Sequence, residues 1–131
     1  MALGKIKADT LEHSTAGSLD TQYVVNGSAK AWTNFVGTGT AAINRSSNSS
    51  GLTDNGTGDY TVSFTTNLVD ANFSFAMAAN QTSTGTGMVT GDSGHQTTLT
   101  AGSIRWGFTG SSSNSITDVA TGSVMVHGDL A

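Results

Sequence analysis

The side chains of residues 54–59 are a first group that could do chemistry, because they bring several oxygen ligands close together. The ligand oxygens would come from Asp54, Asn55, Thr57 and Asp59. A helix-flanked calcium loop needs acidic or amide ligands at alternate positions and glycine at the sixth, and this run departs from that pattern. Asn and Gly are typical turn residues. We therefore expect a tight turn here, with no metal site and no cofactor.

Ser93 could be a nucleophile, because residues 91–94 read Gly-Asp-Ser-Gly, the tetrapeptide around the reactive serine of trypsin-like serine proteases. His95 follows where those enzymes have a second glycine, and the chain has no cysteine and is too short for a double barrel. A serine nucleophile also needs a base that a third group holds in place. A glycine-rich loop gives no such support, so we expect a non-enzymatic protein without catalytic residues.

The histidines and tryptophans could form a metal site or a sugar-stacking platform. His13, His95 and His127 are far apart in the sequence and lack the spacing of metal ligands, so we interpret each as a surface residue. Trp32 and Trp106 lie within alternating runs, which are typical of core positions. A ligand surface would then lie in the loops at residues 45–50, 80–102 and 110–115.

The composition indicates a polar exterior that carries few charges. About half of the residues are Ser, Thr, Gly or Asn, and 11% are charged. The net charge is −4, and five Lys and Arg residues are too few to neutralise a nucleic-acid backbone. No apolar run is long enough to span a membrane. We expect neither nucleic-acid binding nor membrane insertion.

A side-chain period of two recurs from residue 29 onwards. It is clearest at residues 59–64, where large apolar side chains alternate with hydroxylated ones. Further short runs occupy residues 29–36, 40–44, 52–54, 71–79, 104–108 and 123–129. Asn55-Gly56, between two such runs, is the strongest hairpin signal. This spacing predicts an all-β fold, a β-sandwich or jelly-roll-like domain over residues 29–131, with no helix longer than about two turns.

The predicted core collects the large apolar side chains of these runs. It consists of Trp32, Phe35, Ile43, Tyr60, Val62, Phe64, Phe73, Phe75, Met77, Ile104, Trp106, Phe108, Val124 and Val126. At about 25 cal/mol per Å² of buried apolar surface, this set is adequate but thin for the length of the chain. Small domains without disulfides gain burial by association, so we expect a symmetric homo-oligomer.

The first 28 residues differ from the rest of the chain. They contain scattered aliphatic side chains with no sustained period, and we interpret them as an extended N-terminal arm. Such a segment cannot bury its apolar residues alone. We expect the arm to attach to a partner chain through Ile6, Leu11, Leu19 and Tyr23.

Several stretches resemble the short tail-fibre-like and virion structural proteins of tailed bacteriophages, notably marine ones. They are residues 4–11, 29–35, 37–40 with Ile43, 53–65 and 70–74, so that the resemblance covers about residues 3–79. Residues 80–102 match nothing that we can place in this family, and the role of that region stays open.

The resemblance implies a non-enzymatic protein of the virion surface, present in many copies and trimeric. Its partners would be other virion proteins, its own copies and a host-surface glycan. Two roles compete: a fibre or appendage component that contributes to host-surface attachment, and a head decoration protein that clamps neighbouring capsid subunits. The shortness of the chain and its arm favour decoration, whereas the stretches that carry the resemblance favour a fibre. Of the two roles, we expect the fibre role.

Overall fold

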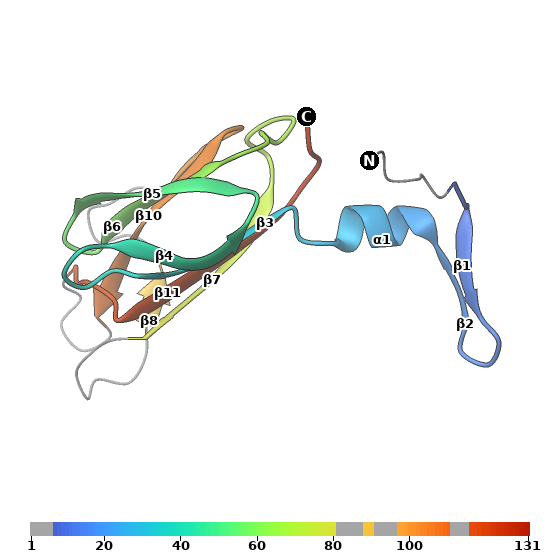
Figure 1. The fold of residues 1–131 in the computed structure, drawn as a ribbon, viewed down its shortest axis with the longest axis horizontal. Coiled ribbons are helices and arrows are strands. Elements are labelled where there is room, and N and C mark those ends of the chain that lie inside the picture. Colours follow the sequence, from blue (N-terminus) through green and yellow to red (C-terminus); the bar gives the residue numbers. More distant parts are fainter. Residues whose placement is uncertain (1–6, 81–87, 91–96, 111–115) are drawn as a thin grey trace.

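The computed structural model describes residues 7–80, 88–90, 97–110 and 116–131, and its ribbon has two parts (Figure 1). An N-terminal arm contains β1 (Thr10–His13), β2 (Gly17–Asp20) and α1 (Thr21–Gly27). Strands β3 to β11 form a β-sandwich, which confirms the all-β fold predicted from the alternation. No helix in the described part of the chain has the length and apolar character needed to cross a membrane.

The sandwich consists of two antiparallel sheets. In the first, the strand order is β5-β6-β10-β8, and β9 also pairs with β10. In the second, the order is β4-β3-β11-β7. The bounds of the first sheet's strands are β5 (Ser49–Gly56), β6 (Asp59–Phe64), β8 (Met88–Thr90), β9 (Thr98–Thr100) and β10 (Ser103–Gly110). Those of the second are β3 (Ala31–Val36), β4 (Ala42–Ser47), β7 (Ser74–Asn80) and β11 (Thr121–His127).

The predicted hairpin joins β5 to β6, but its turn comes two residues later than the Asn-Gly signal. Strand β5 continues through Gly56, and the turn residues are Thr57 and Gly58. Gly58 has a φ of 66°, and a Cβ there would lie 2.6 Å from the carbonyl oxygen of Thr117. Both the left-handed backbone and the close approach require glycine at this position, which is why the turn forms here.

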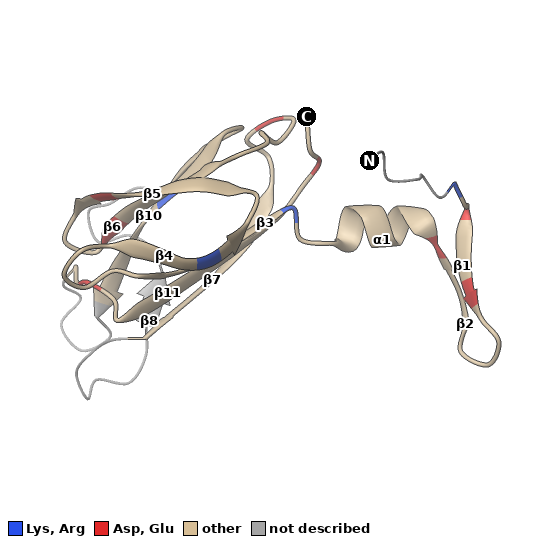
Figure 2. Ribbon diagram, in the orientation of Figure 1, with Lys and Arg blue, Asp and Glu red and all other residues tan. Residues whose placement is uncertain are grey.

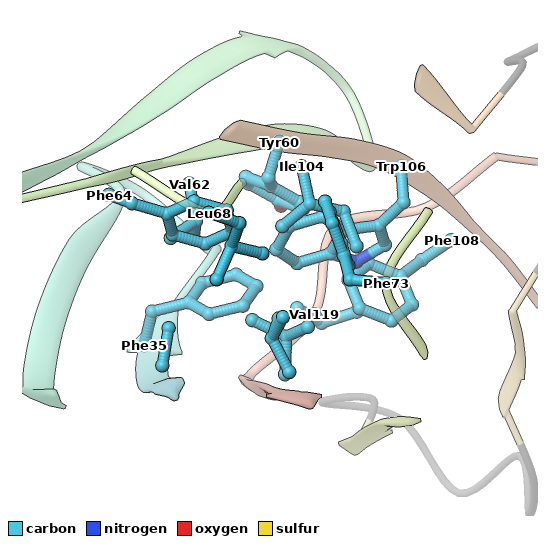
Figure 3. Packing of buried hydrophobic residues seen from close by; sticks show 13 residues of the cluster. Phe35, Tyr60, Val62, Phe64, Leu68, Phe73, Ile104, Trp106, Phe108 and Val119 are labelled. Atoms are coloured by element: carbon cyan, nitrogen blue, oxygen red, sulfur yellow. The ribbon is translucent and has the colours of Figure 1, made fainter. Parts of the chain in front are cut away.

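A continuous aromatic cluster fills the space between the two sheets (Figure 3). The ring of Phe35 from β3 lies 5.1 Å from Tyr60 and 5.9 Å from Trp106, measured between ring centroids. Ten predicted core residues are buried: Phe35, Tyr60, Val62, Phe64, Phe73, Ile104, Trp106, Phe108, Val124 and Val126. The sequence interpretation missed Ala31, Leu68 and Val119, which are buried as well.

Trp32 and Phe75 are corrections to the predicted core. Ala31, Thr33 and Phe35 face inward, so Trp32 at the intervening position faces out and is 39% exposed. Phe75 is opposite the buried Val126, but β7 is an edge strand of its sheet, and the ring remains 37% exposed. Ile43 and Met77, on the edge strands β4 and β7, are half-buried for the same reason.

The arm has more local structure than the extended segment that the sequence indicated. Strands β1 and β2 form an antiparallel hairpin, and α1 follows β2 directly. The backbone N–H of Thr21 donates to the carbonyl oxygen of Asp9 at 2.8 Å, and the Thr21 hydroxyl donates to that of Ala8 at 2.6 Å. These bonds fix the start of the helix against the start of the hairpin.

Candidate interaction surfaces

The arm presents large apolar side chains to solvent. Leu11 and Leu19 are directly opposite each other in the hairpin and are 50% and 48% exposed. Tyr23 on α1 is 61% exposed. Three of the four residues predicted for attachment therefore lie exposed on the arm, and the fourth, Ile6, is outside the described residues.

Two further apolar residues of α1 extend this surface. Val24 and Val25 are exposed, and together with Leu11 they line a hollow of about 540 Å³ between the hairpin and the helix. Sequence interpretation did not single them out, although two adjacent valines in a segment without a period were a usable signal. We call the exposed residues Leu11, Leu19, Tyr23, Val24 and Val25 the arm surface.

The connection between arm and sandwich is held by Lys30. Its backbone N–H donates to the carbonyl oxygen of Val126 in β11 at 2.8 Å. Its ammonium group donates to the carbonyl oxygens of Val25 and Ser28, at the C-terminal end of α1. This places the helix beyond the end of the sandwich, with the hairpin farther out still (Figure 1).

A second apolar surface lies on the outer side of the four-stranded sheet. Met125 of β11 is opposite Trp32 of β3 on one side and opposite Ala76 of β7 on the other. The next row consists of Asn34, Ser123 and Ala78. These two rows line a shallow groove of about 270 Å³, which we call the sheet groove.

The sheet groove has an apolar centre and a polar border. Trp32 and Met125 are 39% and 46% exposed, whereas Ser47 and Arg45 of β4 are opposite Trp32 and Asn34. The Asn34 amide is oriented by Asn44, whose Nδ2 donates to Asn34 Oδ1 at 3.1 Å. An apolar centre within a polar rim is the usual anatomy of a protein–protein interface.

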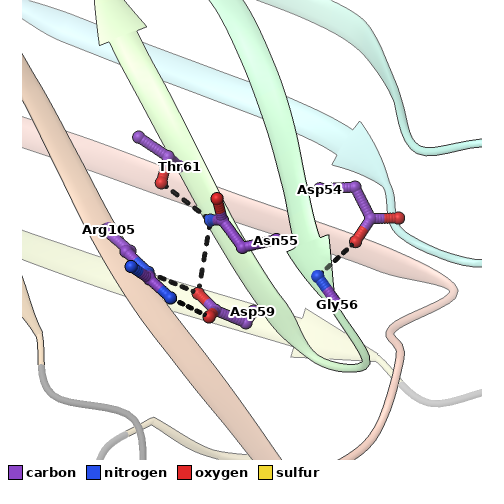
Figure 4. A network of polar contacts seen from close by, with 6 residues as sticks. All are labelled: Asp54, Asn55, Gly56, Asp59, Thr61 and Arg105. Carbon is purple, nitrogen blue, oxygen red and sulfur yellow. Dashed lines mark hydrogen bonds and ion pairs between the residues drawn. The ribbon is translucent and has the colours of Figure 1, made fainter.

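The outer side of the five-stranded sheet has a different chemistry, shown in Figure 4. The guanidinium of Arg105 on β10 donates to both oxygens of Asp59, at 3.0 and 2.5 Å, and this raises the pKa of Arg105 through the hydrogen bonds and the charge. The Asn55 amide bridges to the Thr61 hydroxyl at 2.8 Å. Neighbouring positions on β5, β6 and β10 are mostly hydroxylated, so the described side chains of these three strands form no apolar centre on this face.

The polar contacts in Figure 4 also show what Asp54 and Asp59, considered above as calcium ligands, do in the structure. Asp54 Oδ1 accepts the backbone N–H of Gly56 at 3.0 Å, which is an Asx turn. Asp59 is 1% exposed and forms the ion pair with Arg105. The described residues contain no group of three or more side chains suited to a metal ion.

Tyr60 and Asp118 form a polar contact at the end of the core. The Tyr60 hydroxyl oxygen lies 2.9 Å from the carbonyl oxygen of Gly37 and 3.0 Å from Asp118 Oδ1, and its single proton is available to either acceptor. The backbone N–H of Gly58 donates to the same carboxylate oxygen at 2.7 Å. Burial, with a further contribution from Asp118, raises the pKa of the Tyr60 phenol well above its ordinary value.

Those of the remaining candidates that the structure describes do not come together in one site. Trp106 is buried in the core while Trp32 lies on the outer side of the opposite sheet, so the two rings form no shared platform. His13 is exposed in the arm, and His127 is half-buried in β11. Ser93 and His95 lie outside the described residues.

Charge is distributed unequally over the two apolar surfaces (Figure 2). The arm, residues 1–28, contains the acidic residues Asp9, Glu12 and Asp20 together with Lys5 and Lys7, so that its formal net charge is −1. Strands β3, β4, β7 and β11 contain Arg45 and no Asp or Glu. The arm is therefore weakly acidic, and the sheet that carries the groove is weakly basic.

Comparisons of this chain with family models, with curated proteins and with solved structures each give no match.

Proposed function

We propose that this chain is a non-enzymatic bacteriophage virion surface protein, a fibre or appendage component that contributes to host-surface attachment. The observation that carries the proposal is the arm surface, on a segment that packs mainly on itself: Leu11 is exposed beside Leu19 in the hairpin and lines one hollow with Val24 and Val25. Exposed apolar side chains gathered in this way are typical of a surface that a partner covers. The resemblance of residues 3–79 to phage virion proteins supports a virion partner.

In this role the two parts of the chain have different tasks. The arm joins the protein to a neighbouring virion chain, and the sandwich is displayed on the particle surface, where a host glycan is its outer partner. The protein acts as a homo-oligomer, and we propose a trimer. Exposed apolar residues such as Leu11 and Met125 support association, because a second copy could cover them.

Head decoration is the second candidate. In that role the same arm would clamp a neighbouring capsid subunit rather than a tail component. The specific support is the combination of a single small sandwich with one projecting arm (Figure 1). Imaging labelled protein on the particle separates the two roles, because a fibre component lies on the tail and a decoration protein lies on the head.

The double variant Leu11→Ser/Leu19→Ser tests the attachment role of the arm. We expect it to fold and to be lost from purified particles, because serine removes the apolar side chains that a partner would cover. The matched control is Ser18→Ala, on an exposed hairpin residue without a large apolar group. Normal incorporation of the double variant would overturn the proposal.

A further inference from the structure

We infer that the arm of one copy lies across the sheet groove of a second copy of this chain. The inference rests on the proposed role of the arm as the attachment element: the neighbouring virion chain that receives the arm is a second copy, and the assembled oligomer is the unit that enters the particle. The occupant of the groove is thus a segment present in every copy, and the apolar residues of both surfaces become buried in one step.

The apolar chemistry of the two surfaces is complementary. The arm projects branched side chains, with Leu11 and Leu19 side by side in the hairpin. In the groove, Ala76 and Ala78 leave space beside the larger Trp32 and Met125. A leucine pair can enter above the alanines and contact the indole and the thioether, which are the most exposed apolar groups of that sheet's centre.

The distribution of charge favours the four-stranded sheet over the five-stranded sheet as the surface that receives the arm. The arm contributes three carboxylates against Lys5 and Lys7, and Arg45 borders the groove on a sheet without any Asp or Glu. On the other sheet, Asp54 and Asp59 accompany Arg105, whose guanidinium already binds Asp59. An acidic arm is attracted to the first surface and gains little at the second.

The geometry of the connection between arm and sandwich indicates that the arm reaches the groove of a second copy and not the groove of its own chain. Lys30 fixes both the first residues of the sandwich and the end of α1, and the helix leads away from the sandwich (Figure 1). The hairpin of a chain therefore lies beyond its own groove but within reach of a neighbour. Head-to-tail exchange of identical arms closes into a ring when the rotation allows it, and a ring of three copies is the proposed trimer.

Cysteine cross-linking tests the contact directly, because the chain has no cysteine of its own. Leu11→Cys protein is mixed with Ala76→Cys protein, one of them carrying a short tag, and the mixture is oxidised. We expect a disulfide between the two variants. The matched control, Thr53→Cys, places the thiol on an exposed residue of β5 in the other sheet and should give little product. Equal cross-linking to both positions, or linkage only between two Leu11→Cys chains, would overturn the inference.

Complementation in solution gives an independent readout. By sedimentation, the unmodified protein should associate, and Trp32→Ser and Leu11→Ser/Leu19→Ser should each sediment as monomers. Their equimolar mixture should form a one-to-one complex, since one variant retains an intact arm and the other an intact groove. Arg45→Glu should weaken association by about tenfold, with a reduced dependence on salt. A double variant Leu11→Cys/Ala76→Cys that cross-links only within one chain would show the arm on its own sheet and would contradict the inference.

These outcomes are separate from those that test the proposed function. A protein that stays monomeric at micromolar concentration, or a groove that binds only another virion protein or a sugar, overturns arm exchange even if the arm is needed for incorporation. A protein that exchanges arms but never enters particles overturns the proposed function and leaves the exchange standing.

Discussion

The sandwich and the arm use large apolar side chains in opposite ways. In the sandwich, Phe35, Tyr60 and Trp106 are at most 1% exposed and contact one another across two sheets. In the arm, Leu11, Leu19 and Tyr23 are about half exposed or more on a two-stranded hairpin and a helix of two turns. A hairpin alone is marginally stable in water. The difference is that the sandwich contains its own hydrophobic core, whereas the arm leaves its large apolar side chains in solvent.

Replacing Phe35 by Ala should destabilise the sandwich more than any other substitution considered. Phe35 is fully buried and contacts Tyr60, Trp106 and Phe108, so the substitution leaves a cavity at the centre of the aromatic cluster. We expect a loss of about 3–5 kcal/mol in the free energy of unfolding, measured by denaturant titration. The matched variant Phe75→Ala, at a ring that is 37% exposed, should cost clearly less. Equal costs would mean that the two rings are equally buried.

Gly122→Ala should be the next most damaging change. Strand β11 passes over Phe35, and a Cβ at residue 122 would lie 2.3 Å from the Phe35 ring. Since the ring is packed on all sides, we expect a cost of about 1–3 kcal/mol from overpacking. Gly51→Ala is the control, because a Cβ there meets nothing within 4 Å. Thermal unfolding of both variants compares them, and similar melting temperatures would contradict the packing described.

Tyr60→Phe should cost about 1–2 kcal/mol near neutral pH, because it removes the hydroxyl whose single proton bonds to the Gly37 carbonyl oxygen or to Asp118 inside the protein. Its pKa is raised in the folded state, whereas an unfolded tyrosine ionises near pH 10. The stability that this group contributes is thus present below pH 10 and is lost as the pH rises further. We expect the free energy of unfolding to fall by up to about 1.4 kcal/mol per pH unit above about pH 10. Tyr60→Phe should show a shallower fall, and identical slopes would contradict the assignment.

Leu11→Ser/Leu19→Ser should have the smallest effect on stability. Neither leucine contacts the aromatic cluster, so we expect a change below about 0.5 kcal/mol in the unfolding of the sandwich under monomeric conditions. Denaturant titration of the dilute protein measures it. A cost comparable to that of Phe35→Ala would mean that the arm belongs to the fold.

The strict alternation in β6 and β10 made most of the core predictable from sequence. Tyr60 of β6 and Trp106 of β10, for example, are paired across these neighbouring strands, and both are buried as expected. The prediction was wrong where large side chains were assigned to the core without regard to whether their spacing along the strand was even. Trp32 and Phe35 are three residues apart in one strand, so they face opposite sides, and only tertiary packing decides which one is inside.

Buried apolar residues outside the strands were the other part of the core that the sequence did not predict. Leu68 and Val119 lie in connections between strands, where no period marks them, yet they close the two ends of the core. The sheet groove was missed for a related reason. It joins three strands from distant parts of the sequence, and the register that places Met125 between Trp32 and Ala76 cannot be read from any one strand. The exposure of Leu11, Leu19 and Tyr23 could be predicted without a register, because they lie in a segment without a period, and their role in attachment stays a prediction.

Deletion of residues 1–22 tests the central claim, that the arm attaches the protein and the sandwich folds without it. We predict that the truncated chain gives a β-type circular dichroism spectrum and unfolds cooperatively, but no longer incorporates into particles. A truncated protein that binds virions as well as the intact chain would place the attachment surface in the sandwich and contradict this account.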